Sequence, residues 1–272
     1  MDRNLKIGVV GLGLIGGSIF KALCALKCDV SGSSRSNCTI EKAKKYCENV
    51  SKSLLPLKHC DVIFVCTHIN NTEEVLDKLD KILPASAIVV DVCSIKRFLC
   101  DKKRHYKYIP SHPMAGTEFA GFDYSFETLF QKSKWILTPL EGTKDEDIQK
   151  VIDVIEVLGA TPIFTTPKEH DEAVALISHM PMLVAQAIFK TVQSSSLALK
   201  LASSGFRDMT RLALSSCEMA EDLINLNSDN IQQAILKLYS SVGELLSGDY
   251  LSQVTEIKKE RQVMYIDGKN IL

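Results

Sequence analysis

The chain has 272 residues, enough for two modest domains, and 46 % of them are hydrophobic, as in an ordinary globular protein. A formal net charge of −1 without any basic block excludes the charge pattern of a nucleic-acid-binding protein. The apolar runs look shorter than the roughly 20 residues that span a bilayer, so we expect no membrane partner. A strand beginning near Leu5 leaves no room for a signal peptide, and we expect a cytoplasmic location.

The first half of the chain alternates apolar strand patterns with helical ones. Strands are predicted at residues 5–10, 28–32, 61–66, 87–92, 108–110 and 135–138, with residues 163–164 closing the sheet. Helices are predicted at residues 18–26, 72–83 and 145–158. Nearly continuous apolar strands are typical of a parallel sheet buried on both faces. The alternation predicts an α/β fold with a doubly wound parallel sheet, in a domain that covers residues 1–166.

The pattern changes near Pro167, after which only helical periodicity remains. Helices are predicted at residues 173–193, 197–214, 230–246 and 251–264, and no strand is expected there. We therefore predict an all-helical domain that covers residues 167–272. A domain of this size cannot cover all its apolar surface alone, so we expect it to pack on a second copy in a homodimer.

The nine cysteines are an odd number and contain no CxxC pair. Both features argue against a disulfide framework and against a thiolate metal site. We therefore expect no bound metal, and we expect the thiols to pack as small apolar groups.

A glycine-rich turn follows the first predicted strand and opens the first helix. Gly11 permits the tight turn, Gly13 lets a ligand approach the backbone, and Gly16 lets the helix pack closely on the strand. The free N–H groups at the start of such a helix favour a pyrophosphate, which predicts a Rossmann-type dinucleotide site. The residues expected to bind the cofactor are Gly11, Leu12, Gly13, Leu14, Ile15, Gly16, Ser33, Ser34, Arg35 and Thr67.

The end of the second predicted strand indicates which dinucleotide is preferred. NAD enzymes place an acidic residue there for the ribose 2′-hydroxyl, whereas this chain has Ser34 followed by Arg35. A guanidinium would bind a 2′-phosphate that a carboxylate would repel. The pattern favours NADP and leaves NAD possible; the alternative is that Arg35 is a solvated loop residue.

Four further strings carry chemistry. They are DVCSIK at residues 91–96, SHPMAGTE at 111–118, ISHMP at 177–181 and GFRDMTR at 205–211. Together with the glycine turn, they resemble the prephenate/arogenate dehydrogenase family of tyrosine biosynthesis, in order and over nearly the whole chain. The resemblance implies a helical dimerisation domain and an active site between the two domains. It also implies oxidative decarboxylation of a small-molecule substrate, with hydride transfer to NAD(P).

The resemblance implies roles for several residues. His112 matches the catalytic histidine that accepts a hydrogen bond from the ring hydroxyl, which suits an imidazole near neutral pH. Ser94 matches a serine that orients this histidine and contacts the cofactor. The alternative for His112 is a structural histidine, and the alternative for Ser94 is an N-cap or turn serine. The residues implied in substrate binding are Arg211, Arg207, His179, Thr117 and Glu118.

Two of these roles have a basis in spacing. Arg207 and Arg211 are four residues apart, so a continuous helix places both on one face, with a dicarboxylate held between them. The alternative is an ion pair between Asp208 and Arg211. For His179, the alternative to a role near the substrate is that the side chain is buried for structural reasons alone.

The choice of substrate rests on weaker signals. Met182 stands where prephenate-specific members often carry histidine, and the serine–arginine pattern resembles the NADP-dependent arogenate branch, so we favour arogenate over prephenate. A β-hydroxyacid-dehydrogenase-like oxidoreductase is the first alternative, although such proteins lack the strings at 111–118 and 205–211. A non-catalytic NAD(P)-sensing protein is the second, and the intact His112, Ser94 and Arg211 argue against it.

Overall fold

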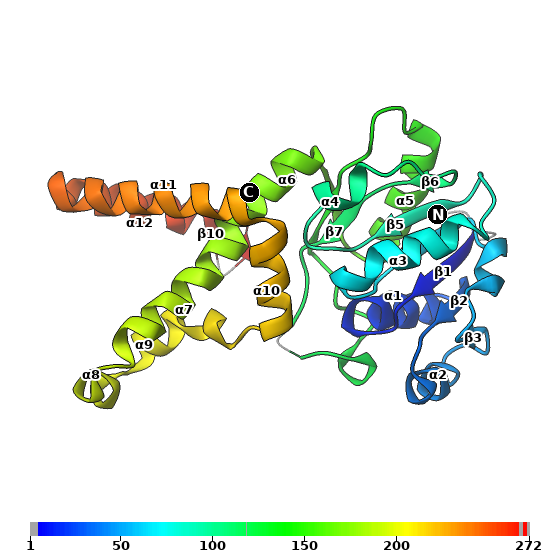
Figure 1. Ribbon diagram of the computed structural model, residues 1–272, viewed down its shortest axis with the longest axis horizontal. Coiled ribbons are helices and arrows are strands. Elements are labelled where there is room, and N and C mark those ends of the chain that lie inside the picture. Colours follow the sequence, from blue (N-terminus) through cyan, green and yellow to red (C-terminus); the bar gives the residue numbers. More distant parts are fainter. Residues whose placement is uncertain (1–4, 118, 267–268, 271–272) are drawn as a thin grey trace.

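The computed structural model describes residues 5–117, 119–266 and 269–270, and it contains a sheet-bearing part and a helical part (Figure 1). The main sheet has six parallel strands in the order β3-β2-β1-β4-β5-β6. They are β1 (Lys6–Val10), β2 (Asp29–Ser33), β3 (Val50–Ser51), β4 (Val62–Val65), β5 (Ile88–Asp91) and β6 (Lys107–Tyr108). This is the Rossmann order, which confirms the predicted fold class and places a ligand crevice where β1 and β4 diverge.

Helices cover both faces of the main sheet. They are α1 (Leu14–Ala25), α2 (Asn37–Ala43), α3 (Ile69–Asp80), α4 (Arg97–Cys100) and α5 (Asp145–Val157), with 3₁₀ turns at Leu55–His59 and Phe122–Tyr124. On one face, α1 packs Ile19 and Phe20 into a core that also holds the fully buried Trp135. On the other face, Leu76 of α3 shares a core with Met182 of the helical part. The two parts therefore share one hydrophobic core, which fixes their junction.

A second, three-stranded sheet follows the first. It consists of β7 (Ser111–Pro113), β8 (Lys134–Leu137) and β9 (Thr161–Phe164); β7 and β8 are antiparallel, and β8 and β9 are parallel. The expectation that residues 163–164 close the main sheet was therefore wrong. The amides of Lys107 and Ile109 donate to the carbonyls of Ala87 and Val89, whereas the next carbonyl, that of Asp91, accepts from the hydroxyl of Ser111. The chain leaves the main sheet at that point.

The helical part starts with a run that is not regular throughout. Helix α6 (Pro167–Val174) continues through a π-helical turn at Ala175–His179 into α7 (Met180–Val192). Pro181 cannot donate a hydrogen bond within this run, and a local change to wider turns accommodates that loss. The run carries His170, Asp171 and His179 toward the sheet-bearing part.

The remaining helices are shorter and more broken than expected. They are α8 (Ser196–Leu201), α9 (Ser204–Met209), a 3₁₀ turn at Arg211–Leu214, α10 (Cys217–Leu226), α11 (Ser228–Ser247) and α12 (Tyr250–Met264). The single helix predicted for residues 197–214 was wrong. Its first break is the extended backbone of Ser203, and at the second the Thr210 hydroxyl donates to the Phe206 carbonyl. The backbone of Thr210, with φ of −99° and ψ of 5°, leaves the helical conformation there.

Two further expectations need correction. Strands β10 (Tyr265–Ile266) and β11 (Lys269–Asn270) form a short antiparallel pair where only helix was expected. Residues 167–192 also form one helical run that is long and apolar enough to cross a membrane by length and composition. The expectation that every apolar segment is too short was therefore wrong. This run carries buried polar side chains that hydrogen-bond to other elements of the fold.

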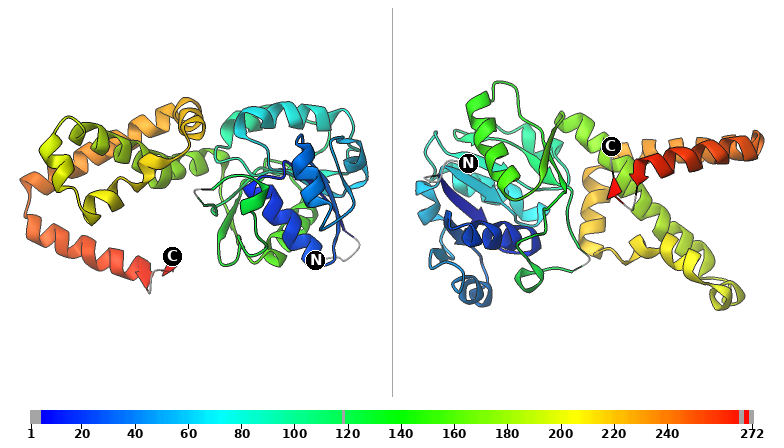
Figure 2. Two further views of the ribbon diagram at one scale, coloured as in Figure 1. Left: turned by 90° about the horizontal axis from the view of Figure 1, so that it is seen from below. Right: turned by 180° about the vertical axis from the view of Figure 1, so that it is seen from behind.

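The outer helices leave much apolar surface uncovered. Helices α11 and α12 project away from the sheet-bearing part, as both views of Figure 2 and Figure 1 show. Along α11, Leu236, Tyr239, Val242 and Leu246 are all exposed, and their spacing places them on one face. No residue of α12 is buried. A monomer would leave this apolar stripe in water.

Candidate active site

The glycine turn has the geometry that its sequence predicts. Gly11 adopts a φ of +86°, and a Cβ there would lie 2.7 Å from the carbonyl oxygen of Cys66. A Cβ on Gly16 would lie 2.1 Å from the carbonyl oxygen of Gly11, so only glycine lets α1 start this close to the strand. Around Gly13, which precedes the first residue of α1, an added Cβ would meet open space. That space gives a phosphate access to the free N–H groups of the helix.

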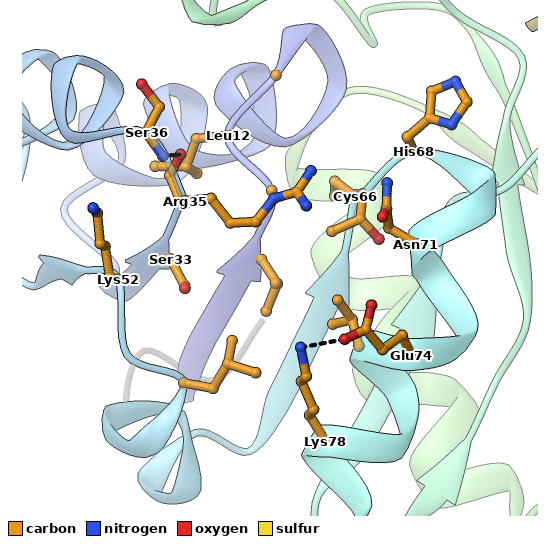
Figure 3. A pocket seen from close by; sticks show the side chains of 17 residues that line it. Leu12, Ser33, Arg35, Ser36, Lys52, Cys66, His68, Asn71, Glu74 and Lys78 are labelled. Carbon is orange, nitrogen blue, oxygen red and sulfur yellow. Dashed lines mark hydrogen bonds and ion pairs between the residues drawn. The ribbon is translucent and has the colours of Figure 1, made fainter. Parts of the chain in front are cut away.

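A pocket lies at this turn, where β1 and β4 diverge (Figure 3). Its volume is about 590 Å³, and segments that follow β1, β2 and β4 line it. Of the expected cofactor residues, Gly11, Leu12, Gly13, Ser33, Ser34, Arg35 and Thr67 line this pocket. Leu14, Ile15 and Gly16 form the first turn of α1 instead. The residues and the space fit a dinucleotide.

One end of the pocket carries positive charge. Arg35 and Lys52 are both exposed and both line it, and the guanidinium of Arg35 extends into the cavity (Figure 3). Across the pocket, Glu74 pairs with Lys78 at 2.6 Å; this hydrogen bond lowers the pKa of Glu74, and Arg35 lowers it further. Lys52 was missed by sequence reasoning because it follows β3, a two-residue strand too short to show a pattern. Its position follows from the pairing of Ser33 with Ser51.

A second group of polar residues gathers at the junction of the two parts. His112 on β7 is half-buried, and its Nδ1 lies 3.0 Å from Nε2 of His170 on α6. His170 is 2 % exposed, and its Nδ1 lies 2.8 Å from a carboxylate oxygen of Asp171. We call His112, His170 and Asp171 the histidine relay. The HPMAG string located His112, whereas the roles of His170 and Asp171 did not emerge from the sequence.

Burial and neighbouring charge keep His112 a base. Burial lowers the pKa of His112 well below its usual range, and His170, Lys96 and His179 lower it further. His112 is therefore neutral at neutral pH and has a lone pair available for a proton. A neutral imidazole at the edge of a cofactor domain can act as a general base.

A buried ion pair supports the strand that carries His112. The ammonium group of Lys96 binds the carboxylate of Asp91 and also donates to the carbonyl of Ser111 at 2.5 Å. The Ser111 hydroxyl donates to the backbone carbonyl of Asp91 at 2.6 Å, and the indole of Trp135 donates to that hydroxyl at 3.0 Å. These bonds fix the residue immediately before His112.

His179 lies at the end of the π-helical turn and is 1 % exposed. Its Nδ1 lies 3.1 Å from Nδ2 of Asn227, which also donates to the backbone carbonyl of Asp171 at 2.8 Å. Burial lowers the pKa of His179 to about 4, although Asp171 opposes this shift. The structure thus joins His179 to the histidine relay through Asn227, a residue that the sequence did not single out.

Two further expected site residues lie in connecting segments of the sheet-bearing part. Ser94 is half-buried in the segment that joins β5 to α4. Thr117 is exposed in the loop after β7, where its hydroxyl accepts a bond from the amide of Phe119 at 3.3 Å. Glu118 lies outside the described residues.

The two arginines differ from expectation. Arg207 lies on α9, which ends at Met209, and Arg211 begins the following 3₁₀ turn, so no continuous helix places them on one face. Asp208 pairs with Arg207 at 3.3 Å on the exposed surface, and not with Arg211. Arg211 is exposed as well. A shared helical face was therefore the wrong reason for grouping the arginines, because the break at Thr210 intervenes.

The cysteines add little chemistry to the site. All nine thiols are free, and Cys38 and Cys217 are exposed, whereas the others are buried or half-buried. Burial raises the pKa of Cys93 to about 12, which keeps that thiol protonated. Over residues 5–117, 119–266 and 269–270, no group of three His, Cys, Asp or Glu side chains is arranged to hold a metal ion.

A glycine-turn pocket on a Rossmann sheet, together with a neutral, half-buried histidine where that domain meets a helical one, is typical of nucleotide-dependent dehydrogenases. Family models narrow the class. The model of the nucleotide-binding domain of prephenate dehydrogenase matches residues 21–164, and that of its dimerization domain matches residues 166–247. The chain belongs to the prephenate dehydrogenase family.

Individual relatives agree with the family match. A cyclohexadienyl dehydrogenase of Zymomonas mobilis is 28 % identical, with 96 % of each chain covered. The crystal structure of Synechocystis arogenate dehydrogenase is 33 % identical with a TM-score of 0.83, covering 96 % of this chain and 97 % of that one. Prephenate dehydrogenase from A. aeolicus, solved with hydroxyphenyl propionate and NAD⁺, is 28 % identical with a TM-score of 0.81, covering 95 % and 96 %.

Proposed function

We propose that this protein oxidatively decarboxylates arogenate with NADP and so produces tyrosine. Family membership makes the chain an NAD(P)-dependent prephenate/arogenate dehydrogenase, and the choice of arogenate and NADP is the finer proposal. The observation that carries the activity is the neutral, half-buried His112 at the junction of a dinucleotide-binding domain and a helical domain.

The chemistry needs a base, a grip on carboxylate and a hydride acceptor. When bound, the nicotinamide ring takes up the hydride that leaves the hydroxyl-bearing ring carbon. His112 accepts the hydroxyl proton as the carbonyl forms. The bond between the ring and its carboxylate breaks, and carbon dioxide leaves. The electron pair of that bond stays with the ring and makes it aromatic. Ser94 is proposed to orient His112, while Arg211 and Arg207 are proposed to bind substrate carboxylates as charge-assisted donors.

His179, Thr117 and Glu118 complete the proposed substrate site. His179 is neutral and held by Asn227, so it can present its other ring nitrogen as a hydrogen-bonding group without adding charge. Thr117 offers an exposed hydroxyl on the loop after the strand that carries His112. The proposal for Glu118 rests on the family resemblance alone.

The preference for arogenate rests on two supports. Met182 is apolar and 3 % exposed at the position where prephenate-specific relatives often have histidine. The solved relative with 33 % identity is an arogenate dehydrogenase. The two substrates differ by an amino group against a keto group on the side chain.

The preference for NADP rests on charge. No carboxylate follows β2, and Arg35 and Lys52 approach the same end of the pocket from two strands. Two cations beside a small hydroxyl residue suit a 2′-phosphate better than a 2′-hydroxyl.

Steady-state kinetics with both cofactors and both substrates tests these choices. We expect the highest kcat/KM for NADP with arogenate. Ser34→Asp is expected to shift preference toward NAD, and Lys52→Ala to weaken NADP selectively, whereas the exposed Lys45→Ala is a matched control. A higher kcat/KM with NAD in the wild type would refute the cofactor choice, and a higher value with prephenate would refute only the substrate choice. Cofactor binding without turnover would favour the non-catalytic sensor.

A homodimer through the helical part is also proposed. Its supports are the match to a dimerization-domain model and the exposed apolar stripe on α11. Exposed apolar surface of this extent is typical of an interface. A cytoplasmic location stays a prediction of the sequence.

A further inference from the structure

We propose that His170 and Asp171 are positioning residues that fix the tautomer of His112, with the proton on Nδ1 and the lone pair on Nε2. This inference rests on the proposed function, because it explains how His112 becomes a base directed at the substrate hydroxyl. The histidine relay acts through His112 and does not itself touch the reacting atoms.

The relay begins at Asp171, whose two carboxylate oxygens are both committed as acceptors. The backbone amide of Lys96 donates to one oxygen at 2.8 Å, and the backbone amide of Arg97 donates to the other at 2.9 Å. The side chain of Asp171 is 2 % exposed, so water does not compete for these bonds. A carboxylate held this way requires a donor from its third partner, Nδ1 of His170, at 2.8 Å. His170 therefore carries its proton on Nδ1.

The next bond follows from the count of protons on a neutral imidazole. A neutral ring has one N–H, so with Nδ1 protonated the Nε2 atom of His170 is an acceptor. Nδ1 of His112 lies 3.0 Å from that acceptor and must donate to it. The remaining nitrogen of His112, Nε2, then holds a lone pair. Asp171 thus determines, through two rings, which nitrogen of His112 is basic.

The other charged groups near the relay are already paired. The ammonium group of Lys96 binds Asp91 and the carbonyl of Ser111. Asp91 also accepts from the Tyr108 hydroxyl at 2.8 Å. His179 is held by Asn227, which also donates to the backbone carbonyl of Asp171. Among the residues that the structure describes, Asp171 is the carboxylate hydrogen-bonded to the two histidines of the relay, through His170.

The arrangement also helps once the proton has moved. When Nε2 of His112 takes the hydroxyl proton, the ring becomes a cation whose Nδ1–H still points at His170. The carboxylate of Asp171 lies directly behind, and it stabilises that charge through the second ring. Substrate oxidation therefore requires no rotation of His112. A water molecule in place of His170 could either donate to Nδ1 of His112 or accept from it, so it would not fix the tautomer.

Nitrogen-15 NMR of the histidine-labelled, substrate-free wild-type protein at pH 8 tests the tautomer without any assay. We expect His112, assigned by comparison with His112→Gln, to show a protonated Nδ1 and an unprotonated Nε2. The opposite tautomer, or a mixture of the two, would overturn the inference. Because no turnover is measured, this result is independent of which substrate the protein uses.

Kinetics of two His170 variants give the second readout. His170→Gln keeps an acceptor toward His112 and a donor toward Asp171, whereas His170→Leu keeps neither. We expect His170→Leu to lower kcat about 10- to 100-fold, less than the roughly 10²- to 10⁴-fold loss of a whole general base because His112 remains. The KM for the cofactor should be unchanged, and His170→Gln should recover most of the loss. Equal kcat values for the two variants, or losses confined to KM, would contradict the proposal. If wild-type protein turns over neither prephenate nor arogenate, the proposed function fails while the NMR result still decides the tautomer.

Discussion

The ammonium group of Lys96 and the carboxylate of Asp91 form an ion pair in which both side chains are fully buried. The pair lies beneath the strand that carries His112, because Lys96 also binds the carbonyl of Ser111. An isolated buried charge is costly, so each member depends on the other. The pair therefore links the stability of the sheet-bearing part to the position of the proposed base.

Lys96→Met should leave Asp91 charged and without its cation. We expect the free energy of unfolding to fall by about 3–5 kcal/mol, the usual cost of breaking a buried pair. Urea denaturation measures this, and Lys103→Met, at an exposed lysine, is the matched control. The double variant Asp91→Leu/Lys96→Met should recover part of the loss. A single variant as stable as the control would show that the pair contributes nothing.

Arg211→Ala should raise the KM for the substrate about 10- to 100-fold, which corresponds to a lost charge-assisted bond of about 1.5–3 kcal/mol. Arg207→Ala should have a smaller effect, because that guanidinium is already paired with Asp208. Steady-state kinetics with saturating cofactor gives both values, and Lys200→Ala is the control for an exposed cation. An unchanged KM in Arg211→Ala would remove Arg211 from the substrate site.

Stability should decrease as the pH falls below neutrality, and His179 should contribute to the decrease. Burial lowers its pKa to about 4 in the folded protein, whereas the unfolded chain has an ordinary histidine pKa near 6.5. Between these values the unfolded chain binds more protons, so protonation favours unfolding. From pH 7.5 to pH 5 we expect a loss of about 2 kcal/mol from this residue alone.

Urea denaturation of wild type and His179→Asn at both pH values isolates that contribution. The variant has no imidazole at residue 179, so its free energy of unfolding should depend less on pH. An equal loss in the two proteins would show that His179 titrates normally in the fold.

Light scattering at micromolar concentration should give a mass of about twice the 30.1 kDa of one chain. Tyr239→Glu/Leu246→Glu introduces charge into the exposed stripe of α11 and should produce monomers, whereas Ser241→Glu, exposed on another face of α11, should not. A monomeric wild type would refute the proposed dimer. A dimeric double variant would place the interface elsewhere.

The features that the sequence predicted well are local ones. The strand at Val62–Val65 is a run of four buried apolar residues, and the glycine turn has a steric reason for Gly11 and for Gly16. Helix α10 was missed, although Ser216 caps it by accepting a bond from Met219, because its acidic residues interrupt the apolar pattern. Capping residues were therefore a usable signal there.

The features that the sequence could not predict depend on distant parts of the chain. His112 and His170 are 58 residues apart, and Asn227 and Asp171 are 56 apart. Their contacts exist because the second sheet and α6 meet at one junction. Neither periodicity nor spacing carries that information. The separation of Arg207 and Arg211 was also unpredictable from spacing, since the chain changes from α9 to a 3₁₀ turn at Thr210.

The central claim is that His112 is the base of an NAD(P)-dependent dehydrogenase. The most direct test follows nicotinamide reduction with arogenate and with prephenate, in wild type and in His112→Asn, at saturating cofactor. We predict turnover by the wild type and a kcat about two to four orders of magnitude lower in the variant, with cofactor binding retained because the glycine turn is separate. Near-wild-type turnover by His112→Asn would contradict the account.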